Sequence, residues 1–578
     1  MRFDMRAFGH REAQGPKVSS RYRKVLWILL FVVLDLLILT IHSSYPIRLS
    51  DEVAVYFQIP VLFWALILTL TVLWWLLFSR ARSPFQIMLG VALFYFILYS
   101  PNLFFISPYQ QTDKSISTFI SIIADSSHID ESAITMNDYF EWPIFFVFSK
   151  TLINITGVSI SQLLHVGILS FNMMVPLFLL LYFKKSGENG EHQYSIIPPI
   201  VYILIAYMFI VNQFAPQTMA LVLFFLVMGL YVKLMDLNTR ETSTYLFLFI
   251  IAYFTLTFTH PFFFIFALAP IMGDFLSKAI RNRRVPGHVT SIDSRAMVNI
   301  IMLLIVIYIS GFLYQFFSIE NSVQLLIDII GTTGGETWDS LFSAVGGSSS
   351  TSFYPLFFPS LSQYYNIFSW GTKLCLVTFA LLFLYLMVRY PRARKEVKSL
   401  DIWLILWSGF LYVVGLFSIF LGQRSVQVMV MPVSKAFSAP ELRTRLVGAV
   451  LALLVICAPV VLLSNNIVNQ SMSGAPFMDD VRSNTVGRFA DTTVPSADNV
   501  LLAESLYPVS NAPYGFYRFT EIDEIDNTST FEDMNLMIYT PKLNMQIEGY
   551  GTEYMAMERN PSLSKVYTMV SSTILYRG

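Results

Sequence analysis

The sequence predicts an all-α membrane protein with about 12 to 13 transmembrane helices and a small carboxyl-terminal soluble domain, either α/β or β. Of the 578 residues, 55% are hydrophobic and only 13% are charged, whereas about a quarter of an average globular domain is charged. The mean hydropathy is +0.58. Apolar runs of about 20 residues, long enough to cross a bilayer, recur from residue 25 to residue 464. Together these observations place most of the chain in a membrane.

The apolar runs give the predicted spans in chain order, with boundaries soft by several residues. A basic tail, residues 1–24, precedes the first run. That run is long for a signal peptide and no small-residue cleavage site follows it, so we interpret it as a retained span. The strong runs cover 25–42, 54–78, 86–105, 161–183, 195–213, 216–234, 244–259, 261–277, 297–316, 366–389, 401–421 and 446–464, and a weaker run lies near 425–440.

Lysine and arginine predict the orientation, because short cytoplasmic loops retain them. Basic residues precede the first span and follow each even-numbered span, as Lys184 and Lys185 follow the fourth. We therefore expect a multi-pass protein of the cell (plasma) membrane with a cytoplasmic amino terminus. The two long loops, 101–160 and 317–365, then face outward, and the second contains no Lys or Arg.

The weak run decides on which side residues 465–578 lie. If it crosses the membrane, this tail is extracellular, and otherwise the tail is cytoplasmic. Lys435 and Pro432 argue against a free-standing span, but a helix bundle tolerates both near an interface. Glycosylation-type triplets begin at Asn469 and Asn527, which favours thirteen spans and an outer tail.

The tail itself has the pattern of a small soluble domain, α/β or mostly β. Turn-forming residues separate short β-leaning runs such as Val500–Leu502 and Lys565–Val570. It contains no nucleophile elbow, phosphate loop or metal cluster that would indicate its chemistry.

The first long outer loop is acidic and contains an apolar patch. From residue 109 to residue 160 it contains six carboxylates and two lysines, and the patch Trp142–Phe148 suits the membrane surface. Asp113, just after the third span, is a candidate general base, because partial desolvation would raise its pKa towards a useful range. The alternative is a solvated carboxylate that caps the following helix.

Further acidic residues in the outer loops have two interpretations each. Asp138 and Glu141 could supply a second acid or ligands for a divalent metal ion, or could simply mark where a helix meets the headgroups. Glu336 lies in a Gly/Ser-rich stretch that fits a closing lid as well as an idle linker. No two histidines have metal-ligand spacing, so a divalent metal ion would have to be held by these carboxylates, and no other cofactor is indicated.

Polar residues near span ends complete the candidates. A guanidinium at Arg424 suits a lipid phosphate, although it could equally be a snorkelling anchor. His260 and Gln217 each lie at a short outer hairpin, where they could contact a sugar, hydroxyl or phosphate, and a lone histidine is often structural. Asp35 is the one clearly intramembrane carboxylate, and a transporter is expected to have more of them.

Several of these motifs together resemble those of GT-C-type membrane glycosyltransferases, especially archaeal ones. The resemblance covers roughly residues 86 to 465 and lies in short segments: Asp113 with Tyr139–Pro143, Phe214–Ala220, Thr259–Pro261 and Arg424. It implies a GT-C-like fold and the transfer of a sugar, with inversion, from a polyprenyl-phosphate or polyprenyl-pyrophosphate donor to an acceptor on the outer face. It also implies that Asp113 deprotonates or orients the acceptor and that Arg424 holds the donor phosphate.

The chain also departs from neighbouring patterns. Thirteen spans and an outer tail resemble the oligosaccharyltransferase catalytic subunit, but its Trp-Trp-Asp-Tyr-Gly motif is absent and more than one span precedes the loop of Asp113, where that family has one. Lys114 stands where a second acid is common in the wider group. We therefore favour transfer of a single sugar to a glycan, lipid or protein acceptor in surface glycan assembly.

Two other function classes stay open. A transporter or flippase of a lipid-linked substrate predicts charges that face a cavity within the spans. A non-catalytic scaffold of a cell-envelope complex would keep the fold without the base. Membrane lipids are expected partners in each case, and nucleic acid is not, because no basic aromatic patch is present.

Overall fold

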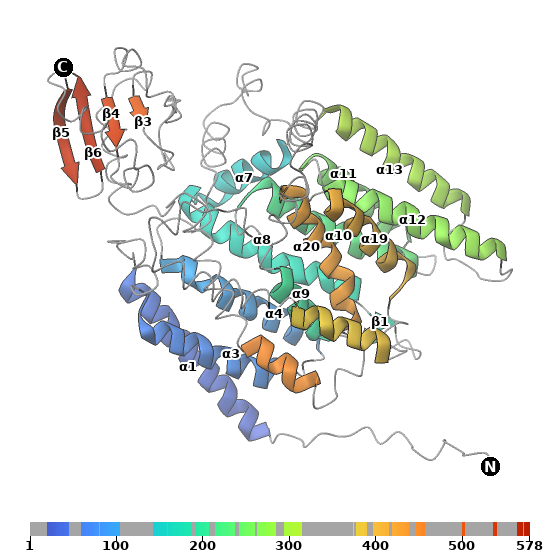
Figure 1. Ribbon diagram of the computed structural model, residues 1–578, viewed down its shortest axis with the longest axis horizontal. Helices are drawn as coiled ribbons and strands as arrows, with labels where there is room; N and C mark the ends of the chain where they lie inside the picture. The colour runs from blue at the N-terminus through green and yellow to red at the C-terminus, as the bar shows by residue number, and fades with distance from the viewer. Residues whose placement is uncertain are drawn as a thin grey trace, which may run out of the picture.

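The structure is a computed structural model, shown in Figure 1. It describes residues 20–45, 59–79, 81, 83–104, 143–158, 160–183, 185–186, 192–193, 195–206, 214–236, 242–260, 263–284, 294–314, 374, 377–389, 397–414, 419–437, 447–456, 500–502, 536–539, 563–569 and 572–577.

Helices lie at every predicted apolar run, so the prediction of a mainly helical chain is confirmed. In the part of the chain that the structure describes, three helical segments are long and apolar enough to cross a membrane: Tyr22–Ser44, Val61–Phe78 and Pro216–Met235. The helices are α1 (Ser20–Ser44), α3 (Val61–Phe78), α4 (Pro84–Tyr99) with the 3-10 turn η2 (Ser100–Phe104), α7 (Pro143–Thr156), α8 (Ile160–Phe183), α9 (Ile197–Ala206), α10 (Pro216–Asp236), α11 (Thr242–Thr257), α12 (Phe263–Arg284), α13 (Ser294–Tyr314), α19 (Ser399–Val414) and α20 (Ile419–Ala436). Shorter apolar helices cover Val377–Arg389 and Val447–Ile456.

The weak run is part of a continuous helix. The sequence placed its start near residue 425, whereas α20 begins at Ile419 and ends at Ala436. It packs along α19 and also contacts α9. Lys435, near the end of α20, contacts Asp401, near the start of α19, so the two helices are antiparallel.

Helix α10 lies at the centre of the bundle and α1 at its edge. Of the apolar window of α10, 78% is buried, against 28% for α1. Many exposed side chains of α1 are large and apolar, as at Phe31 and Leu39, and α13 is similar, as at Met302 and Leu313. Such outward apolar faces are typical of helices that contact lipid.

Glycines allow several helices to approach closely. A Cβ added at Gly273 of α12 would lie 2.3 Å from the ring of Trp403 in α19, and one at Gly229 of α10 would lie 2.9 Å from Cβ of Leu181 in α8. Small residues at helix contacts are the usual packing device of membrane bundles. The α8–α10 and α12–α19 contacts are among the most extensive that the structure describes.

Hydroxyl groups inside the apolar helices bond to their own backbone. Thr71, Thr257 and Ser149 each donate to the carbonyl oxygen four residues earlier, at 2.8 to 2.9 Å. In an apolar surrounding every polar group needs such a partner. These residues therefore satisfy themselves and leave the helix faces free to pack.

Short strands accompany the helices. β1 (Lys185–Ser186) and β2 (His192–Gln193) pair antiparallel just after α8. Between residues 500 and 577 the structure describes a four-stranded sheet, in the order β3-β4-β6-β5, which lies beside the helices in Figure 1. β3 pairs parallel with β4 and the other pairs are antiparallel; the strands are β3 (Val500–Leu502), β4 (Leu536–Tyr539), β5 (Leu563–Met569) and β6 (Ser572–Arg577). That residues 465–578 form a soluble domain remains a prediction.

Candidate functional site

One face of α20 presents two buried cations with apolar residues between them. Arg424, Val428, Met431 and Lys435 follow one another at steps of four, three and four residues, which keeps them on one helix face. Arg424 is 7% exposed and Lys435 6%, while Val428 and Met431 are fully buried. The two cations are three turns plus about 20° apart, or about 16 Å along the axis. We call this row the α20 stripe, and it has one cation at each of its ends.

At one end of the stripe, three of the residues singled out from the sequence come together. Arg424 donates from Nη2 to Oε1 of Gln217 over 3.2 Å. His260 is 2% exposed. It lies close enough to Arg424 for the guanidinium charge to lower the pKa of its imidazole. Burial first, and then that charge, lower the pKa of His260 well below its usual range, so its imidazole is neutral at pH 7. We call Arg424, Gln217 and His260 the Arg424 cluster.

Packing of phenylalanine rings fixes Gln217. Helix α10 begins with Pro216, whose ring suits a first helical position because the N–H it lacks would have no helical partner. Just before it, Phe214 stacks on Phe171 of α8 with ring centres 5.1 Å apart. A Cβ at Gly167 would lie 2.3 Å from the Phe214 ring, so a glycine there lets this ring reach α8.

The same phenylalanine links the cluster to α7. The ring of Phe145 lies 4.9 Å from that of Phe214, and Phe145 and Phe146 are buried. The apolar patch predicted to lie in the membrane surface thus forms the first turns of α7, from Pro143 onward. The helix packs its aromatic residues against the start of α10.

The turn between α11 and α12 places His260. Backbone bonds from Phe258 to Phe254 and from Thr259 to Leu256 close the end of α11. The hydroxyl of Thr259 donates to the carbonyl of Thr255 over 2.6 Å. The imidazole then meets the ring of Phe263, edge to face, at 5.7 Å between centres. The histidine is therefore held by packing, within reach of the charge of Arg424.

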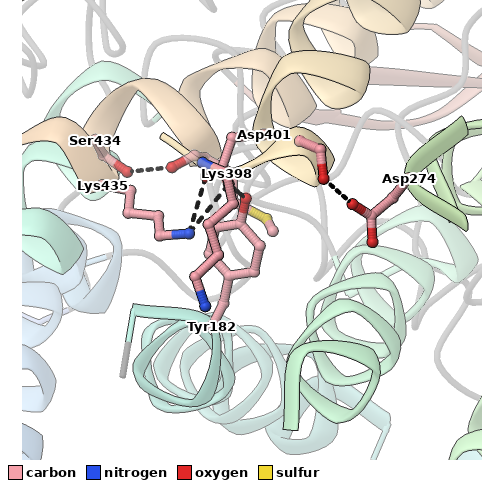
Figure 2. A network of polar contacts seen from close by, with 8 residues as sticks. Tyr182, Asp274, Lys398, Asp401, Ser434 and Lys435 are labelled. Carbon is pink, nitrogen blue, oxygen red and sulfur yellow. Dashed lines mark hydrogen bonds and ion pairs between the residues drawn. The ribbon is translucent and has the colours of Figure 1, made fainter. Parts of the chain in front are cut away.

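At the other end of the α20 stripe, Lys435 forms an ion pair with the buried carboxylate of Asp401. Nζ of Lys435 lies 2.9 and 3.3 Å from the two oxygens of Asp401, which is completely buried. The backbone N–H of Lys398 donates to Asp401 over 2.7 Å, and the hydroxyl of Tyr182 donates to it as well. Nζ of Lys435 also lies 4.8 Å from the centre of the Tyr182 ring. In Figure 2, Lys435 and Tyr182 both point toward Asp401; we call these three the Asp401 triad.

A second triad of the same composition lies next to it. Asp274 of α12 accepts from Tyr231 over 2.7 Å and pairs with Lys278, one turn later, at 2.7 Å. Nζ of Lys278 lies 5.7 Å from the centre of the Tyr231 ring. Ser399, in the first turn of α19, donates to Asp274. The start of α19 therefore joins the two triads. It contains Asp401 itself, and its Ser399 donates to Asp274.

The two triads were not predicted from the sequence. Tyr182 and Asp401 are separated by 219 residues, and no local pattern indicates such a pair. The spacing of Asp274 and Lys278 inside an apolar run was an available signal, because an acid and a base four residues apart face each other on a helix. The sequence interpretation treated the cations there only as markers of orientation.

The other predicted site residues lie apart from these clusters or outside the described residues. Asp35 is in the middle of α1 with an exposed side chain. Asp113, Asp138, Glu141 and Glu336 lie outside the described residues. Within the described part of the chain no group of three or more His, Cys, Asp or Glu residues is arranged to hold a metal ion, so metal binding stays a prediction for the loops.

No protein-family model matches the chain, and no curated protein matches its sequence. A relation to GT-C-type enzymes therefore stays a prediction from the short motifs of the sequence.

Proposed function

We propose that this protein is an inverting GT-C-type membrane glycosyltransferase, which transfers a sugar from a polyprenyl-phosphate donor to an acceptor on the outer face in surface glycan assembly. One observation carries the proposal: buried Arg424 lies with Gln217 and His260 where three separate segments meet. The motifs Phe214–Ala220 and Thr259–Pro261 supply two of those segments, and the GT-C resemblance rests on the same motifs.

The chemistry of the cluster suits a lipid phosphate. A guanidinium is permanently charged and offers a planar set of N–H donors that matches two phosphate oxygens. Gln217 holds one of its nitrogens at 3.2 Å, which orients the fork. In a low-dielectric surrounding such a charge stabilises a phosphate far more than it would in water.

The transfer would proceed as a single displacement. The acceptor hydroxyl loses its proton to Asp113, and its oxygen bonds to the anomeric carbon as the bond from that carbon to the phosphate oxygen breaks. Negative charge builds up on the leaving polyprenyl phosphate, where Arg424 stabilises it. Neutral His260 has one donor and one acceptor nitrogen, so it could donate a hydrogen bond to a sugar hydroxyl or accept one from it.

Mass spectrometry of the host cell's surface glycans tests this function. We compare wild type, a deletion, Arg424→Gln and Asp113→Asn, with Arg389→Gln as the matched control, because Arg389 is an exposed arginine at the end of another apolar helix. We expect the deletion and both site variants to lose the same sugar while the variant proteins still accumulate in the membrane. Intact glycans in the deletion strain would rule the function out.

A second candidate, transport of a lipid-linked substrate, is favoured by a different observation. The Asp401–Lys435 and Asp274–Lys278 pairs lie at helix contacts, and charges inside a membrane bundle often mark a path for a substrate or an ion. Fractionation of the lipid-linked sugar in the deletion strain separates the two functions. Accumulation on the outer leaflet supports transfer, whereas accumulation on the inner leaflet supports transport.

A further inference from the structure

We propose that Asp401 and Lys435 are positioning residues for Arg424, because their ion pair fixes α20 along its axis and so sets the place where the guanidinium meets a lipid phosphate. This inference rests on the proposed function. It assigns a role in substrate binding to a pair at the far end of the helix from the cluster.

The geometry of the α20 stripe connects the two sites. Arg424 and Lys435 share one face of a single helix, so a shift of the helix by one residue would move both by about 1.5 Å and rotate both by about 100°. Lys435 cannot make such a shift without leaving Asp401, because both carboxylate oxygens lie within 3.3 Å of its Nζ. The ion pair thus holds Arg424 in register with Gln217.

The last turn of α20 depends on contacts outside the helix. Pro432 lies inside the helix between the two cations, and a proline removes one backbone hydrogen bond and allows a helix to bend. The backbone alone therefore does not fix the last turn. The contacts of Lys435 with Asp401 and with the Tyr182 ring do so.

Stability alone does not explain the pair. A buried ion pair is often no more stabilising than apolar residues of the same volume, because both charges lose their hydration. Asp401 nevertheless collects donors from Tyr182 of α8, from Lys435 of α20 and from the backbone N–H of Lys398. These directional contacts fix the position of Lys435, and with it that of α20, more narrowly than an apolar contact would.

The second triad offers a matched control. Asp274 and Lys278 have the same chemistry as Asp401 and Lys435, but both belong to α12. Breaking their pair removes a contact between a buried carboxylate and a partly exposed ammonium (the Lys278 side chain is 34% exposed) without releasing α20. A general loss of stability should follow from either pair, whereas a loss of phosphate affinity should follow only from the Asp401 pair.

The experiment measures the dissociation constant for farnesyl phosphate, a short polyprenyl phosphate, and the melting temperature Tm of the full-length protein in nanodiscs. The variants are Arg424→Gln, Lys435→Met, the double variant Asp401→Asn/Lys435→Met, which leaves no buried charge unpaired, and Lys278→Met. We expect Lys435→Met and the double variant to weaken binding at least about fivefold, the lower end of typical coupling between sites. Lys278→Met should lower Tm and leave the affinity within about twofold.

Combination with Arg424→Gln separates positioning from a general loss of structure. If Asp401 and Lys435 act through Arg424, Lys435→Met has no further effect on affinity once the guanidinium is absent, while its effect on Tm persists. An equal loss of affinity in both backgrounds would overturn the proposal.

Two further outcomes distinguish failure of the positioning role from failure of the phosphate site at Arg424. If Arg424→Gln weakens binding but Lys435→Met and the double variant bind as wild type does, the positioning role is wrong and the phosphate site stands. If wild type and Arg424→Gln bind farnesyl phosphate equally, the phosphate site is wrong and the positioning role falls with it.

Discussion

At the scale of single residues, the buried charge of Lys435 depends on one partner. Asp401→Asn keeps the shape of the side chain and leaves an unpaired ammonium in the bundle, which should destabilise the protein by about 3–5 kcal/mol. The double variant Asp401→Leu/Lys435→Met should recover most of that loss, since it removes both charges. Thermal unfolding of the two variants checks this, and a double variant as unstable as the single one would contradict it.

Gly167 controls the ring that precedes α10. In Gly167→Ala the new methyl group would lie 2.3 Å from the Phe214 ring, so the ring and the start of α10 must move, at a cost of about 1–3 kcal/mol. We expect a lower Tm and weaker binding of farnesyl phosphate, because Gln217 moves with that turn. Gly409→Ala is the control, since no heavy atom outside its own helix backbone and chain neighbours lies within 4 Å of a Cβ there.

His260 makes stability depend on pH. Its pKa is lowered on folding, so below about pH 6.5 the unfolded chain binds a proton that the folded protein excludes. Stability therefore falls as pH decreases from about 6.5 towards the folded pKa, and it is unaffected by this residue above that range. Measured between pH 7.5 and 5.5, His260→Phe should have a flatter Tm profile than wild type; equal profiles would show that His260 accepts a proton in the folded state.

At the scale of helices, α12 and α19 depend on a glycine. Gly273 lies against the Trp403 ring, whose Nε1 donates to Ser277 over 2.9 Å. Gly273→Ala should push the ring away, break that hydrogen bond and cost about 1–3 kcal/mol. Adding Trp403→Leu to Gly273→Ala should then be less harmful than adding it to wild type, and additive losses in a double-mutant cycle would refute the contact.

Helix positions were predictable from the sequence because an apolar run of bilayer length leaves the backbone no alternative to hydrogen bonding within itself. The weak run was the hardest to interpret, since Lys435 and Pro432 look unsuitable for a span. The charge that weakened the pattern is neutralised by Asp401, 34 residues earlier. Such a pairing depends on how helices pack and is not visible in local periodicity.

The candidate site was predictable only in part, for the same reason. Arg424, Gln217 and His260 were each singled out from short motifs, but their meeting depends on the approach of three segments. Gln217 and Arg424 are 207 residues apart. The Asp401 triad carried no local motif, the spacing of Asp274 and Lys278 was a signal left unused, and the acidic loop residues Asp113 to Glu141 lie outside the described residues.

At the scale of the whole molecule, the antiparallel pair α19–α20 predicts the side of the tail. If α19 crosses outward, α20 returns inward, and the apolar helix Val447–Ile456 leads outward again. A cysteine introduced as Asn527→Cys, in a background of Cys375→Ser and Cys457→Ser, should therefore react with a membrane-impermeant maleimide on intact cells. Ser20→Cys should react only after the cells are opened, and the opposite pattern would place the tail in the cytoplasm.

The spacing along α20 also limits how this segment can change over evolutionary time. Substitutions at positions that face away from the α20 stripe leave Arg424 and Lys435 in place. A single inserted or deleted residue between them would rotate one cation by about 100° relative to the other and expose its charge to lipid or remove it from its partner. Related sequences should therefore vary in composition through this helix while keeping the 11-residue interval between its two cations.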